Sequence, residues 1–152
     1  MRILDVLTQD AIVPDLRARD KKEVLEQLVQ PVAARTGTSA KDLVRVLMER
    51  ERLGSTGIGG GIGIPHGKLR NLDTLVLGVG LSRQGVDFDS LDGRPTHIFF
   101  LLITPENSTG LHLKLLARIS RILKNEPFKE QLMAAGDAEA VWTAIAAQDE
   151  DF

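Results

Sequence analysis

Two segments near the start of the chain repeat apolar residues with the period of an α-helix. The first covers about residues 21–35, begins with a D-x-x-E capping pattern at Asp20 and contains Pro31, so it predicts a helix kinked near this proline. The second follows Ser39, a favourable N-cap residue, and its apolar stripe ends before Gly54. The pattern therefore predicts two amphipathic helices in the first part of the chain.

Strands are predicted by short apolar runs. The runs TLVLGVGLS (74–82) and THIFFLLIT (96–104) are apolar enough to be covered on both faces, which is typical of the centre of a sheet. The run AIVPDL (11–16) is interrupted by Pro14, which favours a strand at the edge of a sheet. We expect the segment 84–95, between the two central strands, to be a polar connection rich in turns.

Three more helices are predicted in the last third of the chain. One is amphipathic and runs from Leu113 to about residue 124, a short one runs from Pro127 to Ala135, and the last is capped by Asp137. Helices before, between and after the strands indicate an α/β fold built in layers. No internal repeat, low-complexity tract or linker is present, so we expect a single domain over residues 1–152.

Composition narrows the class of function. With 19 Lys+Arg against 21 Asp+Glu the net charge is −2, which disfavours binding to nucleic acid or to anionic membranes. The chain has no cysteine, which excludes disulfides, a thiolate nucleophile and cysteine-ligated zinc or iron–sulfur sites. Aromatic residues make up only 4%, too few for a stacking platform. No apolar run approaches the roughly 18 residues of a membrane span, so a soluble, cytoplasmic protein is expected.

Half of the 14 glycines lie between residues 54 and 67, in the segment GSTGIGGGIGIPHGK. Glycine-rich backbone can direct several N–H groups toward one anion, so the segment predicts an anion site. Pro65 fixes the backbone before His66, and Gly67 leaves space beside the imidazole ring. We therefore expect His66 to be presented to a binding partner, although a glycine cluster can also be an ordinary loop and a lone histidine a surface residue.

The same segment does not match either of the common nucleotide-binding motifs. A P-loop has four residues between its glycines and then K-[ST], whereas five separate Gly61 from Gly67, and Lys68 is followed by leucine. The G-x-G-x-x-G fingerprint of dinucleotide sites also fails in every register. Neither ATP nor NAD is therefore expected as a cofactor.

Two residues elsewhere are candidate partners for an anion near His66. His112 lies at the start of a predicted helix, where free N–H groups and the helix dipole favour an anion and a neutral imidazole. Arg50 lies at the end of the helix that leads into the glycine segment, so its guanidinium can reach an oxyanion there. A solvated histidine and an exposed helix-end arginine are the alternatives that position alone leaves open.

The residues of these segments carry a family resemblance that covers nearly the whole chain. The run ERERLGSTGIGGGIGIPHGK and the P-x6-HL-x2-L spacing that starts at Pro105 resemble the enzyme IIA domain of the fructose/mannitol type. This domain belongs to the bacterial phosphoenolpyruvate-dependent phosphotransferase system. The stretches STGIG and GIPHGKL most resemble its nitrogen-regulatory IIA proteins.

The resemblance implies a fold, a set of site residues and a reaction. The fold would be a three-layer α/β/α domain on a mixed sheet. His66 matches the phosphorylated histidine, His112 the second active-site histidine, and Arg50 the arginine sixteen residues before the phosphorylated one. The phosphoryl group would come from an HPr-like phosphohistidine carrier of the nitrogen branch, without metal or nucleotide. We expect the phosphoryl group to be held also by backbone N–H groups of three glycines, Gly61, Gly63 and Gly67.

A free-standing IIA protein is expected to be a regulator and not a transport component. Such a regulator would contact target proteins in nitrogen, potassium or carbon metabolism. The alternatives are a sugar-specific IIA that passes phosphate to a separate IIB for fructose or mannitol uptake, and a module that binds an anion without being modified. A metal hydrolase built on two histidines is weaker, because no H-x-x-E pattern completes a ligand set. For docking partners we expect an apolar rim that includes Ile58, Ile62 and Ile64.

Overall fold

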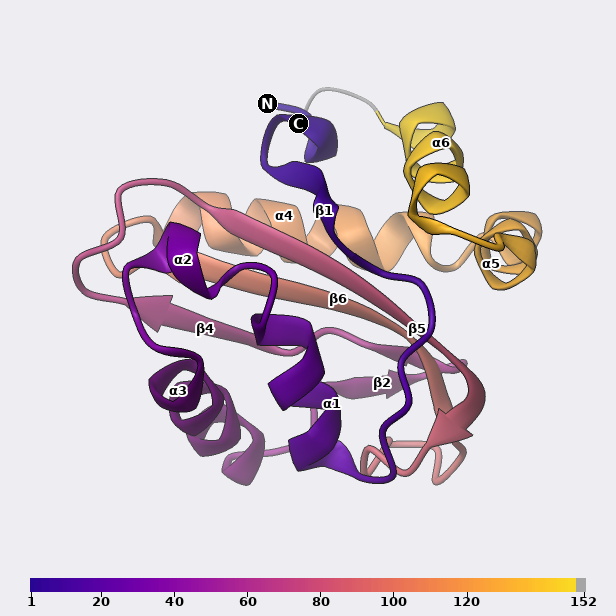
Figure 1. Cartoon of the computed structure of the whole chain (residues 1–152), viewed down its shortest axis with the longest axis horizontal. Coiled ribbons are helices and arrows are strands. Elements are labelled where there is room, and N and C mark those ends of the chain that lie inside the picture. Colours follow the sequence, from indigo (N-terminus) through magenta and orange to yellow (C-terminus); the bar gives the residue numbers. More distant parts are fainter. Residues whose placement is uncertain (150–152) are drawn as a thin grey trace.

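The computed structural model describes residues 1–149 as a β-sheet with helices on both of its faces (Figure 1). The helical elements are η1 (Ile3–Asp5), α1 (Lys21–Val29), α2 (Ala33–Thr36), α3 (Ala40–Arg52), α4 (Thr109–Ile122), α5 (Glu126–Ala134) and α6 (Ala138–Gln148). The strands are β1 (Leu7–Val13), β2 (Gly57–Gly59), β3 (Ile62–Gly63), β4 (His66–Leu69), β5 (Val76–Val86) and β6 (Thr96–Pro105). The helices α1 and α3 lie in front of the sheet in Figure 1, and α4 lies behind it.

The two apolar runs form the centre of the sheet, as predicted. The strand order is β1-β5-β6-β3-β2, and β4 also pairs with β6. The pair β5 and β6 is antiparallel, whereas β1 is parallel to β5, and both β3 and β4 are parallel to β6. The predicted three-layer α/β/α architecture on a mixed sheet is therefore confirmed.

The first strand lies at the edge of the sheet, as the proline in its sequence predicted, but it begins earlier. It covers Leu7–Val13, whereas 11–16 was expected. Leu7 pairs with Leu77, and an irregularity separates this pair from the next, Ile12 with Val79. The residues between Leu7 and Ala11 are polar and exposed, so their sequence carries no apolar alternation that would reveal the strand.

The three helix starts predicted from a capping residue, Asp20, Ser39 and Asp137, are confirmed, and Asn125 caps the short helix that was expected to open at Pro127. The side chains of four cap residues accept a hydrogen bond from a backbone N–H of the first turn: Asp20, Ser39, Asn125 and Asp137. The kink expected near Pro31 is a full interruption, because α1 ends at Val29 and the short helix α2 begins at Ala33. These four helices thus begin where a side chain caps the first turn, whereas α4, expected from Leu113, begins at Thr109 without a side-chain cap.

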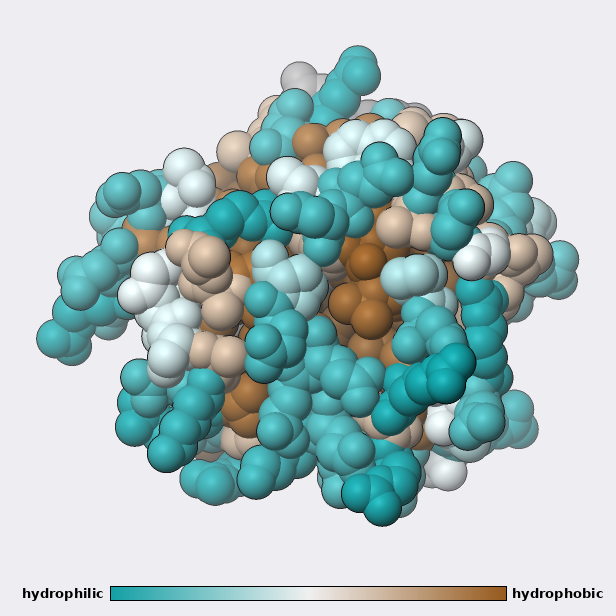
Figure 2. Space-filling view, viewed as in Figure 1, coloured by the Kyte–Doolittle hydropathy of each residue, from teal (hydrophilic) through white to brown (hydrophobic). Residues whose placement is uncertain are grey.

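Helix α1 packs directly on β5 because a glycine leaves room for it. A Cβ atom on Gly80 would lie 2.6 Å from Leu28 Cδ2 and 2.7 Å from Leu16 Cδ1. The core of the molecule contains four wholly buried phenylalanines, which are Phe88, Phe99, Phe100 and Phe128. Figure 2 shows that this face of the molecule is mostly hydrophilic, with apolar side chains visible in hollows between the polar ones.

The glycine segment is not the loop that its composition predicted. It forms three short strands, β2, β3 and β4, and the last two pair with one edge of β6. The register places Ile62 opposite Ile98 and His66 opposite Leu102. These strands have two to four residues each and little apolar alternation, so they are defined by their pairing, β3 and β4 with the distant strand β6 and β2 with β3.

The buried carboxylate of Glu51, at the end of α3, connects this helix to the start of the glycine segment and to α1. Glu51 accepts hydrogen bonds from the backbone N–H of Thr56, at 3.0 Å, and from the Thr56 hydroxyl. Lys21 Nζ lies 3.1 Å from the same carboxylate, whose side chain is almost fully buried. A buried carboxylate requires such partners, and together they fix the end of the helix that carries Arg50.

Candidate functional site

His66 begins strand β4 at the edge of the sheet. Its Nδ1 lies 2.8 Å from the backbone oxygen of Ile64. A carbonyl oxygen only accepts hydrogen bonds, so in the neutral ring the proton is on Nδ1 and the lone pair is on Nε2. Arg50 Nε donates to this Nε2 across 3.3 Å. The Nε2 lone pair of His66 therefore accepts a hydrogen bond from the guanidinium that the end of α3 supplies.

The guanidinium of Arg50 is held by a second contact. Its Nη1 donates to the backbone oxygen of Gly54 at 3.0 Å, just past the end of α3. Gly54 has a φ of 149°, a backbone conformation that residues other than glycine rarely adopt. The turn that ends α3 thus helps to orient the arginine toward His66.

His112 lies in the first turn of α4, and its ring packs against that of His66. The ring centroids are 5.2 Å apart and the planes meet at 65°. The residue is only 4% exposed, so the alternative of a solvated histidine is wrong. Its Nδ1 lies 2.7 Å from Oγ1 of Thr104, at the end of β6.

Both histidines are held neutral at pH 7. Burial, with a smaller contribution from Arg50, lowers the pKa of His66 below its ordinary value. Burial, then the proximity of His66, and then that of Lys68, lowers the pKa of His112 to about 4. The neutral state expected for His112 therefore arises mainly from burial, and the helix dipole that suggested it is not the leading cause.

Acidification should destabilise the fold through His112. In the unfolded chain this histidine binds a proton below its ordinary pKa of about 6.5, whereas in the folded protein it does so only near pH 4. The unfolded state thus binds more protons in this pH range. The contribution of His112 to the free energy of unfolding therefore falls as the pH falls from 6.5 toward 4. We expect the free energy of unfolding to fall by about 2 kcal/mol through His112 between pH 8 and pH 5.

Urea unfolding of the wild type and of His112→Asn at both pH values measures this contribution. The variant lacks the titrating group, so its free energy of unfolding should fall by about 2 kcal/mol less than that of the wild type. An equal fall in both proteins would show that His112 does not carry the effect.

The two histidines open into a pocket of about 460 Å³ between α3 and α4. Its wall holds two cations, Arg50 and Lys68, and one carboxylate, Glu49. Lys68 Nζ donates to the Thr109 hydroxyl at 3.0 Å. Lys68 was not predicted as a site residue, although a strand places residues i and i+2 on the same face and would have put it beside His66.

Only one of the three glycines predicted to hold a phosphoryl group lines this pocket. Gly67 does, and a Cβ there would lie 3.0 Å from Val46 Cγ1, so glycine allows α3 to approach β4. Gly61 instead accepts the N–H groups of His97 and Ile98 on its carbonyl oxygen, and Gly63 packs against the Phe99 ring. The structure does not bring Gly61 and Gly63 into the pocket, because their backbone pairs β3 with β6.

The expected apolar rim is also different. Ile62 and Ile64 are buried in the core, and only Ile58 is substantially exposed. The rim of the pocket is instead formed by Leu53 and Leu113, which are 85% and 60% exposed. Leu53 follows Arg52 at the end of α3, and Leu113 follows His112 near the start of α4. These polar neighbours give no sign of an apolar surface in the sequence.

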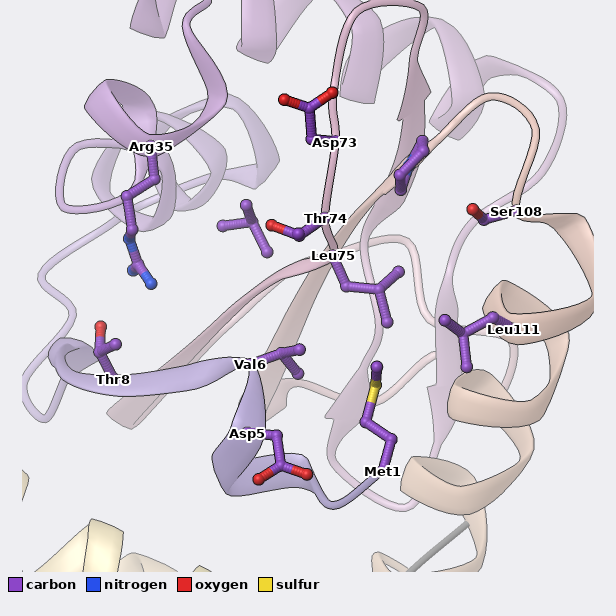
Figure 3. A pocket seen from close by; sticks show the side chains of 12 residues that line it. Met1, Asp5, Val6, Thr8, Arg35, Asp73, Thr74, Leu75, Ser108 and Leu111 are labelled. Carbon is purple, nitrogen blue, oxygen red and sulfur yellow. The ribbon is translucent and has the colours of Figure 1, made fainter.

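A larger pocket, of about 690 Å³, lies between the N-terminal segment and the start of α4 (Figure 3). Its wall includes Ser108, which precedes α4, and Leu111 of the first turn, together with Arg35 and Asp73. None of the three histidines lines it. We therefore place the reactive site at the smaller pocket, where titratable nitrogen atoms and cations meet.

Within residues 1–149, no helix has the length and apolarity that crossing a bilayer would require. The same residues contain no group of three or more histidine, cysteine, aspartate or glutamate side chains arranged to hold a metal ion.

The family model described as phosphoenolpyruvate-dependent sugar phosphotransferase system, EIIA 2, matches residues 5–148. A nitrogen regulatory protein from Bradyrhizobium diazoefficiens is 38% identical over 146 residues, which cover 96% of this chain and 95% of that protein. The fructose-specific EIIABC component of Bacillus subtilis is 32% identical over 150 residues, but this chain spans only 24% of its length.

Solved structures agree with these sequence matches. The crystal structure of nitrogen regulatory protein IIA-Ntr from Neisseria meningitidis superposes with a TM-score of 0.88 at 33% identity, over 93% of this chain and 97% of that one. Mannitol IIA from Escherichia coli has a TM-score of 0.76 at 18% identity, over 91% of this chain and 98% of that one, and so shares the fold.

Proposed function

The chain belongs to the EIIA 2 family of the phosphoenolpyruvate-dependent sugar phosphotransferase system, and we propose that it accepts a phosphoryl group on Nε2 of His66 from a phosphohistidine carrier protein. The observation that carries this proposal is the lone pair of His66 Nε2, which faces Arg50 in a pocket shared with His112. A neutral imidazole with its other nitrogen hydrogen-bonded is a competent nucleophile.

The proposed reaction forms one bond and breaks one. His66 Nε2 attacks phosphorus while the nitrogen–phosphorus bond of the carrier breaks, and the leaving ring of the carrier keeps that electron pair. His66 retains its Nδ1 proton, and the hydrogen bond to Ile64 O stabilises the positive charge that grows on the ring. Two rings thus exchange one phosphoryl group without a metal or a proton shuttle.

The cations around His66 would stabilise the phosphoryl oxygens. As the phosphoryl group approaches Nε2, Arg50 Nε can transfer its hydrogen bond from the ring to an oxygen of the group. Lys68, held at its outer end by Thr109, adds a second positive charge to the same pocket. The N–H groups in the first turn of α4 supply a further favourable field for an anion.

We further propose that the protein is a regulator, with phosphorylation of His66 determining which target protein binds. The support is its similarity to nitrogen regulatory proteins over almost their full length, from Bradyrhizobium diazoefficiens and from Pseudomonas aeruginosa at 36% identity. A phosphoryl group adds about two negative charges beside an apolar rim, which disfavours partners that cover that rim. Transfer onward to a IIB protein for sugar uptake is the second candidate, because the fructose-specific EIIABC component is also a relative.

The exposed leucines of the rim are the proposed docking surface for the carrier. Leu113 lies in the pocket wall and is 60% exposed, so Leu113→Glu should weaken carrier binding about tenfold, or about 1.4 kcal/mol. Leu91 is 76% exposed but does not line the pocket, so Leu91→Glu is the matched control.

Titration of the carrier into each labelled variant measures the two affinities. A loss for Leu113→Glu with wild-type affinity for Leu91→Glu supports docking at the histidine pocket. Equal affinities for both variants would place the carrier elsewhere on the surface.

A further inference from the structure

The hydroxyl of Thr104 is the hydrogen-bond partner of His112 Nδ1. Thr104 lies near the end of β6 and is fully buried, and His112 is 4% exposed, so water does not compete for either group. The distance between Oγ1 and Nδ1 is 2.7 Å. Since a hydroxyl can donate or accept and a neutral imidazole nitrogen can do either, the direction of this bond decides the tautomer of His112.

Hydrogen-bond accounting favours donation by the hydroxyl. Within residues 1–149, Thr104 Oγ1 makes its hydrogen bond with His112 Nδ1, and no carbonyl or carboxylate oxygen accepts from this hydroxyl. If Nδ1–H donated to Oγ1, the hydroxyl proton of Thr104 would be buried with no acceptor. If the hydroxyl donates to Nδ1, its proton is satisfied, and only a lone pair of the oxygen is left over. A buried donor without a partner is the more costly outcome, so the ring proton belongs on Nε2.

We propose that Thr104 is a positioning residue that fixes His112 as the Nε2–H tautomer, so that His112 donates a hydrogen bond in the pocket and does not compete with His66 for the phosphoryl group. The tautomer of His112 follows from the hydrogen bond alone, whereas its effect on phosphoryl transfer rests on the proposed function. The Nε2 edge of the ring lies away from Thr104, and the residue lines the pocket with His66. An N–H group there can bind a phosphoryl oxygen.

The two histidines are thereby given opposite tautomers by two hydrogen bonds of opposite direction. The carbonyl oxygen of Ile64 accepts from His66 Nδ1–H and leaves the lone pair on Nε2. The hydroxyl of Thr104 donates to His112 Nδ1 and leaves the proton on Nε2. Two chemically identical side chains 5.2 Å apart thus become one nucleophile and one donor.

The tautomers are measured directly by long-range ¹H–¹⁵N spectra of the unphosphorylated protein, labelled at histidine, near pH 8. We expect Nε2–H for His112 and Nδ1–H for His66 in the wild type. Thr104→Val keeps the shape and removes the donor, so His112 should shift toward Nδ1–H, whereas Thr104→Ser should keep the wild-type tautomer. An Nδ1–H tautomer of His112 in the wild type overturns the proposal, and this reading stands even where Thr104→Val does not fold.

Phosphoryl transfer supplies the second readout. The initial rate should fall at least about tenfold in Thr104→Val and recover in Thr104→Ser, because only serine restores the hydroxyl donor. Equal rates in all three proteins would overturn the positioning role. Because the tautomers are read without any phosphoryl donor, a wild type that shows the expected tautomers but accepts no phosphoryl group contradicts the proposed function alone.

Discussion

Replacing His66 with alanine is expected to abolish phosphorylation by the carrier protein. His66 Nε2 carries an unprotonated lone pair, because the ring proton is on Nδ1 and is donated to Ile64 O, and this lone pair faces the guanidinium of Arg50. His112 cannot take over the reaction if its Nε2 carries the ring proton, as we propose. The expected loss is therefore complete within the sensitivity of the assay, which makes it the largest effect predicted for any substitution in the chain.

The control for this experiment is the third histidine of the chain. His97 lies in β6 with its Nδ1 2.9 Å from the backbone oxygen of Ser82, and it does not line the pocket. His97→Gln should therefore be phosphorylated at the wild-type rate. Undiminished, acid-labile labelling of His66→Ala, measured with the phosphorylated carrier, would show that another residue is the acceptor.

Loss of the Arg50 guanidinium is expected to slow phosphoryl transfer by roughly 10²–10³, the scale for losing one oriented charge-stabilising group. Arg50 donates to His66 Nε2 and is held by Gly54 O, so its charge is already directed at the place where the phosphoryl group must arrive. His112→Ala should have an effect of similar size, because it removes the donor on the opposite wall. Arg50→Lys keeps the charge but loses the forked geometry, so an intermediate rate is expected.

Arg52 provides a matched control for Arg50. It lies in the same last turn of α3 but is exposed and does not line the pocket. We expect Arg52→Ala to transfer phosphate at nearly the wild-type rate in a rapid-mixing assay, whereas Arg50→Ala does not. Comparable rates for the two variants would mean that the pocket around His66 is not where the phosphoryl group is stabilised.

Local signals made candidates of the three residues that converge on the site, and the family resemblance then selected them over the alternatives that position alone left open. Arg50 is indicated by its position at the end of a capped amphipathic helix, and His112 by its position at the start of the helix after a buried strand. His66 follows from its flanking proline and glycine. Each of these signals lies within a few residues of the side chain that it indicates, but the convergence of the three side chains was implied only by the resemblance, which covers nearly the whole chain.

The misassigned features depend on contacts between distant segments. The strands β3 and β4 exist because β6, more than thirty residues away, pairs with them. The same pairing buries Ile62 and takes Gly61 out of the pocket. Glu51 sits in a charged run that resembles an exposed helix end, yet Lys21 and Thr56 enclose it. Such burial is set by tertiary structure and leaves no periodic trace in the sequence.

The most direct test of the account is a measurement of which atom carries the phosphoryl group. The wild-type protein, labelled with ¹⁵N at histidine and incubated with the phosphorylated carrier, should gain the mass of one phosphoryl group. Its long-range ¹H–¹⁵N and ³¹P spectra should then show phosphorus bonded to Nε2 of His66, with the proton retained on Nδ1. No mass gain, or a phosphoryl group on His112 or on Nδ1 of His66, would contradict the account.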